Sequence, residues 1–246
     1  MKQQRLQKIL ARVLGISRRN ADALIVAGRV AVDGRPAQPG VALQFPAKVP
    51  IHLDGELLTV PAGLWHDPVR MLLYHKAVGS ECSYRPADNR KSIFEGLPEL
   101  KTGRWFSVGR LDVTTSGLLV FANDGDLVHR MMHPSYRFDR EYMVRVQGAV
   151  SPDHLDLLTE GIELEDGMAR FSDLVPGSKV GGVNCWYCVT LMEGRNHLIH
   201  RLFAAVGHRV SRIHRVRFGP LWLPDRLRKE HWLDASPRQL DQVQRW

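Results

Sequence analysis

The spacing of apolar residues at the start of the chain predicts two short helices. These residues recur three or four positions apart, as on one face of a helix, at Leu6, Ile9, Leu10 and Val13 and again at Ala21, Leu24 and Ile25. Gly15 is expected to end the first helix, and Ser17 is a favourable N-cap for the second. Gly28 is expected to end the second helix.

An alternating pattern follows and predicts a β-hairpin. Val30 and Val32 lead into Asp33-Gly34, a dipeptide that favours the tight turn between two antiparallel strands. Arginine is frequent in the first 45 residues, at positions 12, 18, 19, 29 and 35. We therefore expect a small basic module that is too small to hold an active site.

Prolines and glycines mark turns between residues 36 and 68, with one short strand pair at about 49–60. We place the domain junction at 60–68. This placement predicts a first domain, including linker strands, at residues 1–60 and a second domain at residues 68–246.

Beyond the junction, apolar stretches of strand length alternate with stretches of helical periodicity. The expected strands are Met71–Tyr74, Leu118–Phe121, Glu141–Val146 and Trp186–Met192. The expected helices are Leu127–Met132, Pro152–Leu158 and Leu198–Val206. This mixture favours an α+β fold with a mostly antiparallel sheet.

The composition is that of a folded globular protein. The 246 residues are 44% hydrophobic and 24% charged, close to the usual proportions. No stretch approaches the roughly 18 consecutive apolar residues of a membrane span, and the first residues lack the pattern of a secretory signal. With only three cysteines, we expect free thiols, a cytoplasmic location and no membrane partner.

Charge is distributed in blocks along the chain, which has 34 Lys and Arg residues against 26 Asp and Glu. Residues 1–50 carry a net charge of +7, residues 51–194 carry −6, and residues 195–217 hold six arginines and no acid. The basic blocks predict binding to a polyanion, and nucleic acid is the common one in the cytoplasm. A solvated surface is the alternative.

No metal site or cofactor site is indicated. Cys185 and Cys188 have zinc-type spacing, but no second pair exists and both lie in a predicted strand. His129 and His133 lack the glutamate of a metalloprotease motif, and no glycine-rich nucleotide-binding loop is present. A metal-dependent hydrolase using these two histidines and those at 197, 200, 208 and 214 is the alternative from another enzyme class.

The segment Val108–Val120 is the strongest candidate for chemistry. It reads Val-Gly-Arg-Leu-Asp-Val-Thr-Thr-Ser-Gly-Leu-Leu-Val, which places Asp112 on a loop before an apolar strand, with Arg110 and several hydroxyl groups nearby. On composition alone, Asp112 is either a turn residue or a catalytic carboxylate.

Four motifs follow one another along the chain. They are Tyr74-His75-Lys76, Gly109-Arg110-Leu111-Asp112 with Thr115-Ser116-Gly117-Leu118-Leu119, Arg140-Glu141-Tyr142, and Glu193-Gly194-Arg195-Asn196. Together they resemble the pseudouridine synthases, specifically the branch that modifies bacterial ribosomal RNA. The first 45 residues resemble the alpha-L RNA-binding module that this branch carries in front of its catalytic domain. Residues 185–196 and 210–219 look most like the enzymes that modify large-subunit RNA.

The resemblance implies a catalytic domain of the pseudouridine synthase type and a reaction that converts uridine to pseudouridine without a cofactor. Asp112 would act at the ribose, as nucleophile at C1′ or as base at C2′. Tyr142 would stack on the uracil and help to remove the C5 proton. A basic side chain from the Gly194-Arg195 segment would keep Asp112 ionised.

One position departs from the family pattern, because His200 stands where relatives have the arginine that pairs with the catalytic aspartate. His200, Arg201 and Arg195 are the candidates to replace it, with Arg110 as further support near Asp112. We favour an arginine because its charge is permanent. The departure also motivates an alternative, a ribosomal RNA-binding protein that keeps the fold without catalysis.

The target uridine has to leave its stack to react, which costs a few kcal/mol, and arginine contacts to phosphates would offset this cost. The candidates are Arg18, Arg19 and Arg29 in the front module and Arg209, Arg212, Arg215 and Arg217 in the rear block. The expected partner is ribosomal RNA, that of the large subunit before that of the small, and we expect a monomer.

Overall fold

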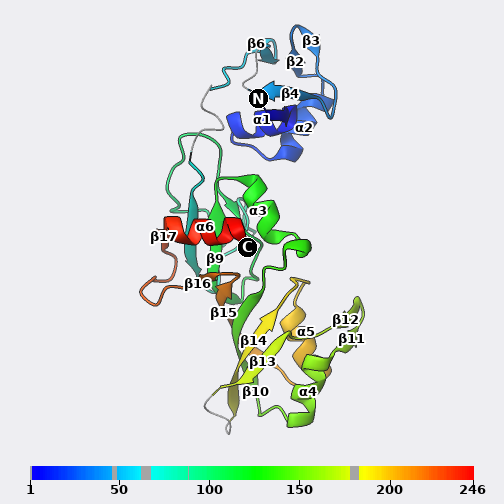
Figure 1. The fold of residues 1–246 in the computed structure, drawn as a ribbon, viewed down its shortest axis with the longest axis vertical. Helices are drawn as coiled ribbons and strands as arrows, with labels where there is room; N and C mark the ends of the chain where they lie inside the picture. The colour runs from blue at the N-terminus through cyan, green and yellow to red at the C-terminus, as the bar shows by residue number, and fades with distance from the viewer. Residues whose placement is uncertain (1, 46–48, 62–67, 88, 178–182) are drawn as a thin grey trace. The chain divides into compact units, whose positions relative to one another are not determined.

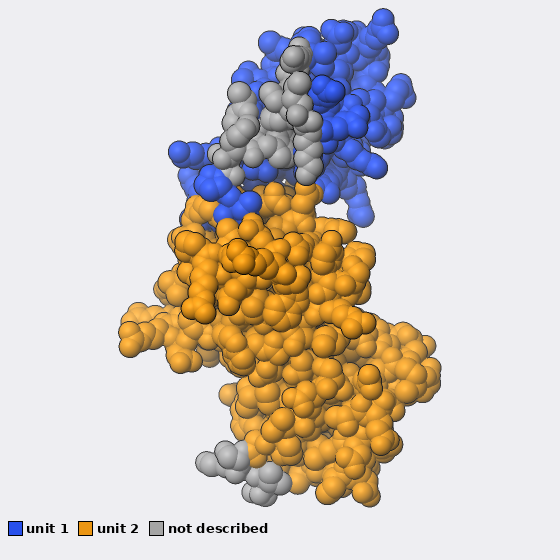
Figure 2. Space-filling model, in the orientation of Figure 1, with its two compact units in different colours: residues 1–69, 98–105 blue, residues 70–97, 106–246 orange. Residues whose placement is uncertain are grey.

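The computed structural model describes residues 2–45, 49–61, 68–87, 89–177 and 183–246. The chain divides into two compact units (Figure 2): the first holds residues 1–69 and 98–105, and the second holds residues 70–97 and 106–246. Most of the junction expected at 60–68 lies outside the described residues. In the described ranges, no helix is long and apolar enough to cross a membrane.

The first unit is built from short elements. In chain order they are β1 (Lys2–Arg5), α1 (Leu6–Val13), α2 (Arg18–Val26), β2 (Val30–Val32), β3 (Arg35–Pro36), β4 (Ala42–Phe45), β5 (Ile51–Leu53) and β6 (Glu56–Leu57). Strand β1 pairs with β4, and the other strands form an antiparallel sheet in the order β3-β2-β5-β6. The expected helices, hairpin and second strand pair are confirmed.

Local chemistry explains these elements. The Ser17 hydroxyl accepts a hydrogen bond from the Asn20 amide at 3.0 Å and so caps α2. Asp33 and Gly34 both have positive φ angles, of 52° and 74°, as the turn between β2 and β3 requires. The apolar faces of α1 and α2 form the core with Val30 and Ile51.

The second unit contains every strand and helix that the sequence predicts beyond the junction. The strands are β7 (Met71–Lys76), β9 (Thr115–Ala122), β10 (Arg140–Gln147) and β14 (Asn184–Leu191), and the helices are α3 (Gly125–Met132), α4 (Pro152–Glu160) and α5 (Leu198–Ala205). The structure adds β8 (Phe106–Ser107), the 3-10 helix η1 (Pro134–Tyr136), β11 (Ile162–Leu164), β12 (Gly167–Ala169), β13 (Asp173–Pro176), β15 (Val210–Phe218), β16 (Leu221–Trp222), β17 (Trp232–Asp234) and α6 (Pro237–Arg245).

One large sheet runs through the second unit (Figure 1), in the order β13-β14-β10-β15-β9-β7-β17. Only the pairing of β15 with β9 is parallel among the described strands, so the mostly antiparallel α+β fold is confirmed. Gly117 allows this junction, since a side chain there would collide with the carbonyl oxygen of Arg215.

Helices α4 and α5 lie on one face of the β13-β14-β10 part of the sheet (Figure 1). Burial alternates along β10 accordingly: Tyr142, Val144 and Val146 are buried, and Met143 and Arg145 between them are partly exposed. The covered face carries the core, and the opposite face meets solvent.

Candidate active site

A cavity of about 570 Å³ lies in the second unit, where three segments distant in the sequence meet. These segments are the loop between β8 and β9, strand β10, and the turn that leads into α5. Polar residues that line the cavity include Arg110, Asp112, Tyr142, Arg195, His197 and His200. The fold therefore brings together residues from three of the four sequence motifs.

The side chain of Lys76 holds the backbone of the Asp112 loop through hydrogen bonds. Its side chain is fully buried, and its ammonium group donates hydrogen bonds to the carbonyl oxygens of Asp112 at 3.0 Å, Thr115 at 2.9 Å and Ala77 at 3.0 Å. Burial lowers the pKa of Lys76, and the negative charge of Asp112 acts against this shift. The buried cation thus holds both ends of the turn from which Asp112 projects.

Cys82 supports the same loop. Its sulfur lies 3.4 Å from the amide nitrogen of Leu111 and 3.3 Å from the carbonyl oxygen of that residue. Burial raises the pKa of the Cys82 thiol, so the neutral form that can donate this hydrogen bond is favoured. Cys82 and Lys76 therefore hold consecutive residues of the loop.

His197 is the side chain that the structure pairs with Asp112. Its Nδ1 atom lies 3.3 Å from Oδ2 of Asp112, and the two side chains are 53% and 38% exposed. His197 is the N-cap residue of α5, and its φ angle of 49° is in the left-handed region. Such a conformation is costly for a residue with a side chain and occurs most often where the surrounding structure holds it.

His200 lies one helical turn further along α5 and also lines the cavity. The ring centroids of His197 and His200 are 6.1 Å apart. Burial lowers the pKa of His200, the charge of His197 adds to this, and Asp112 opposes it. The lowered pKa favours the uncharged form of His200.

Arg195 and Arg201 bind Asp166 instead of Asp112. Arg201 makes two hydrogen bonds of 2.9 Å to the Asp166 carboxylate, and Arg195 contacts the same carboxylate at 3.0 Å and Glu193 at 2.6 Å. Arg195 also donates to the carbonyl oxygens of Gly167 and Met168 in the β11–β12 hairpin. Asp112 thus has a histidine partner where we expected an arginine, because both candidate guanidinium groups are held by the hairpin.

Two of the arginines predicted to bind RNA are held by groups of the protein itself. Arg215 is 3% exposed and donates from Nε to the Leu118 carbonyl oxygen at 2.7 Å. Arg217 is held by the carboxylates of Asp139, at 2.8 Å, and Glu141, at 2.9 Å. The prediction that Arg215 contacts RNA is corrected, since its side chain lies on the covered face of the sheet and is buried. Arg217 is partly exposed and both carboxylates pair with its charge, so its contact with RNA stays a prediction.

The remaining predicted RNA contacts lie at the surface. Arg18, Arg19, Arg29, Arg209 and Arg212 are exposed. Arg29 forms an ion pair with Asp54, which offsets part of its charge. Arg110 is also exposed and lies at the wall of the cavity.

The histidines and cysteines do not form a metal site in the described part of the chain, where no three His, Cys, Asp or Glu residues are grouped to hold an ion. His129 and His133 have ring centroids 5.4 Å apart at the end of α3. Cys185 is buried, and Cys188 donates from its thiol to Glu141 at 3.2 Å.

Sequence reasoning gave His197 a role only in the metal-hydrolase alternative, named Lys76 only within a family motif, and gave no role to Cys82 or Asp166. A lysine directly after the apolar run of β7 indicates a buried cation, and that signal could have identified Lys76. Asp166 lies in an ordinary Asp-Gly turn, so the sequence contains no comparable signal for it.

Comparison with known proteins agrees with this geometry. A family model described as RNA pseudouridylate synthase matches residues 70–205, and a model described as the S4 domain matches residues 4–45, where the RNA-binding module is expected. The chain belongs to the RNA pseudouridylate synthase family.

Individual relatives match over most of the chain. The ribosomal large subunit pseudouridine synthase B of Yersinia pestis is 44% identical over 234 residues, which are 95% of this chain and 73% of that protein. The protein of the same name from Escherichia coli (strain K12) is 43% identical over 236 residues, 96% of this chain and 80% of that one. A crystal structure of a pseudouridylate synthase is 26% identical and superposes with a TM-score of 0.65, covering 97% of this chain and 99% of that chain.

Proposed function

We propose that this protein converts a specific uridine of large-subunit ribosomal RNA to pseudouridine, with Asp112 as the catalytic carboxylate. The observation that carries this proposal is the position of Asp112, on a doubly supported loop at a cavity that also holds Tyr142 and His197. The names of the relatives favour ribosomal RNA as the substrate and the large subunit as its source.

The reaction conserves all atoms of the uridine. The bond between N1 and C1′ breaks, the uracil turns, C5 bonds to C1′, the proton leaves C5, and N1 ends protonated. Asp112 acts either as the nucleophile at C1′ or as the base at C2′, and both routes need its ionised form. His197, when protonated, stabilises that form from 3.3 Å.

Tyr142 and Arg110 contribute from other sides of the cavity. Tyr142 is 9% exposed, so its ring forms an apolar wall against which a uracil can stack. Proton removal from C5 is the second role that we propose for Tyr142. The exposed guanidinium of Arg110 is placed to bind a phosphate beside the flipped nucleotide.

The S4 domain supplies further contacts to RNA through Arg18, Arg19 and Arg29, and Arg209 and Arg212 extend them on the second unit. Phosphate binding by these side chains compensates for the cost of flipping the uridine. We propose that the protein acts as a monomer in the cytoplasm, where ribosomal RNA is modified.

Release of tritium from ribosomal RNA labelled at uridine C5 tests the proposal. The wild-type protein should release tritium from large-subunit RNA and little from small-subunit RNA. Asp112→Asn keeps the shape and removes the charge, so release should become undetectable while RNA affinity changes less than about twofold. Release by Asp112→Asn at the wild-type rate would contradict the role of this residue.

His200 motivates a second candidate, a ribosomal RNA-binding protein without catalysis. His200 lacks the permanent charge of an arginine, and burial lowers the pKa of its ring. Tight binding to ribosomal RNA with no tritium release at any pH would favour that candidate. Release only from small-subunit RNA would instead change the assigned substrate.

A further inference from the structure

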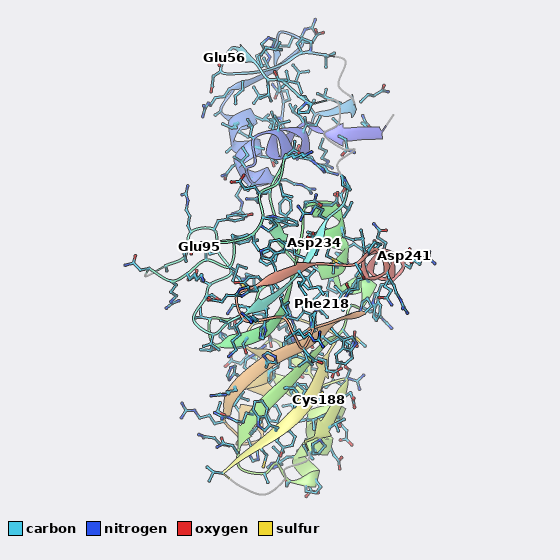
Figure 3. All side chains as sticks on the ribbon, turned by 90° about the vertical axis from the view of Figure 1, so that its left-hand side faces the viewer. Glu56, Glu95, Cys188, Phe218, Asp234 and Asp241 are labelled. Atoms are coloured by element: carbon cyan, nitrogen blue, oxygen red, sulfur yellow. The ribbon has the colours of Figure 1, made fainter. Side chains whose placement is uncertain are left out.

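The sheet face opposite the cavity is open where β15, β10 and β14 lie side by side. Residues on this face are partly exposed, although their neighbours on the other face are buried. Figure 3 looks onto this face, with Cys188 labelled on β14. Helix α5 packs on the other side, where the rings of Phe203 and Tyr187 are 5.9 Å apart.

Three large side chains form one row across this open face. Arg145 of β10 is the direct cross-strand neighbour of Arg212 on β15 and of Trp186 on β14. Like charges directly opposite each other on neighbouring strands destabilise a sheet. Among the described residues, no carboxylate lies within 4.0 Å of either guanidinium group to relieve this repulsion.

The nearest acid of β10 on the same face is already occupied. Glu141 binds Arg217 at 2.9 Å through one oxygen and accepts from the Cys188 thiol at 3.2 Å through the other. The charges of Arg145 and Arg212 are therefore not neutralised within their own face of the sheet. A fold that keeps two such cations side by side gains from a polyanion bound there.

Ser211 orients the guanidinium of Arg145. Its hydroxyl accepts from Nε of Arg145 at 2.9 Å and donates to the Arg145 carbonyl oxygen at 3.1 Å. The register between β10 and β15 shifts at Arg145 and Val146, which places Ser211 beside Arg145. Ser211 binds only Nε, so both terminal nitrogens of Arg145 are left to bind a phosphate as a fork.

We propose that Arg145, Arg212 and Trp186 form a second RNA-binding surface, on the opposite side of the sheet from the target uridine. The two guanidinium groups bind phosphates, and the partly exposed indole stacks on an unpaired base. This inference rests on the proposed RNA substrate. The occupant is a segment of the same ribosomal RNA, remote in sequence or structure from the uridine that enters the cavity.

The salt dependence of RNA binding tests this surface. With large-subunit RNA, Arg145→Gln/Arg212→Gln should bind about 10-fold more weakly, and the slope of log K against log salt should fall by roughly 1.5, as expected for two lost phosphate contacts. Trp186→Leu should weaken binding and leave the slope unchanged, since stacking releases no counterions. Thermal unfolding midpoints check that the variants are folded.

Arg226→Gln/Arg238→Gln is the matched control, because it removes two exposed arginines of the same unit outside this row. If Arg145→Gln/Arg212→Gln has the same RNA affinity and the same salt slope as this control, the proposal is overturned. The proposal would also be overturned if this variant bound RNA like the wild type and lost affinity for an acidic protein instead. Tritium release by the wild type is measured in the same samples: a reduced slope without release retains the surface and rejects the proposed reaction.

Discussion

At the scale of single residues, the partner of Asp112 decides how the site responds to pH. An arginine would keep its charge at every pH at which the protein is folded, whereas histidine changes charge between pH 5 and 8. The contact of 3.3 Å between His197 and Asp112 thus makes the support of the carboxylate dependent on pH. His200 does not replace a lost charge on His197 at high pH, because burial lowers the pKa of the His200 ring.

We predict an alkaline decline in activity that belongs to His197. Burial lowers the pKa of His200, so we assign the decline to His197, whose ring contacts Asp112 at 3.3 Å. kcat/KM should decline as the pH rises through the histidine range. His197→Arg should remove this decline, and His197→Gln should lower the rate at pH 6 far more than at pH 8.5.

His200→Gln is the control for that measurement. It removes a ring that is already neutral, so the alkaline limb should persist. If the limb disappears in His200→Gln and survives in His197→Arg, the assignment of the two histidines is reversed.

At the scale of elements, strand β7 holds the Asp112 loop on one side of the cavity, and the β11–β12 hairpin holds the turn before α5 on the other. Lys76, at the end of β7, binds three carbonyl oxygens around the Asp112 turn. The β11–β12 hairpin holds the turn before α5, since Asp166 binds both Arg195 and Arg201. The distance between Asp112 and His197 therefore depends on residues that do not face the substrate.

Lys76→Met should destabilise the protein and disorder the Asp112 loop. Methionine fills the space but removes the ammonium donor from three carbonyl oxygens, at a cost of about 2 kcal/mol. The carbonyl oxygens of Asp112 and Ala77 keep a second donor, the Thr115 amide and the Ser80 hydroxyl. Urea unfolding measures this change, and tritium release should fall together with it. Lys229→Met, an exposed lysine of the same unit, should change stability by less than about 0.5 kcal/mol.

Asp166→Asn should lower kcat about 10-fold with a smaller change in KM. Asparagine retains the shape but loses the charge that holds the two arginines, and a small displacement of His197 has a large effect on rate. The alkaline limb should weaken as well, which distinguishes a positioning role from general destabilisation. Glu165→Gln removes the same charge one residue away and should behave as the wild type.

At the scale of the whole molecule, the two units have separate cores and separate charge. The first unit has its own buried cluster around Leu10 and Ile25, and residues 1–50 carry +7. Residues 98–105 are an exception to the order along the chain, because they belong to the first unit although the second surrounds them in sequence. The first unit thus holds its basic charge on a core of its own, and all residues that line the cavity belong to the second unit.

Deletion of residues 1–60 should weaken RNA binding and flatten its salt dependence, because the lost charge acts through phosphates. The second unit should keep its near-ultraviolet circular dichroism. Proteolysis should become faster within residues 98–105, which lose the unit to which they belong. An unchanged salt slope would mean that the first unit binds something other than RNA.

The sequence by itself determined the two helices and the hairpin of the first unit, four strands and three helices of the second unit, and the family. Helix caps, periodicity and turn dipeptides act within a few residues, so Ser17, Asp33-Gly34 and the alternation along β10 could be interpreted without a structure. The motif around Asp112 and the basic first module indicated the reaction through their resemblance to the pseudouridine synthases. Strand β15 was seen only as a basic run, since arginines concealed its alternation.

Only the tertiary structure decided which charges meet. Asp112 lies beside His197 because the loop before β9 and the start of α5 meet at the cavity. Arg195 and Arg201 do not pair with Asp112 because both bind Asp166. Arg215 and Arg217 look the same as Arg212 in sequence, yet Arg215 is buried, Arg217 is partly exposed and Arg212 is exposed. A guanidinium binds the nearest well-placed carboxylate or carbonyl oxygen, and this distance is set by strand register and helix packing, which no local pattern contains.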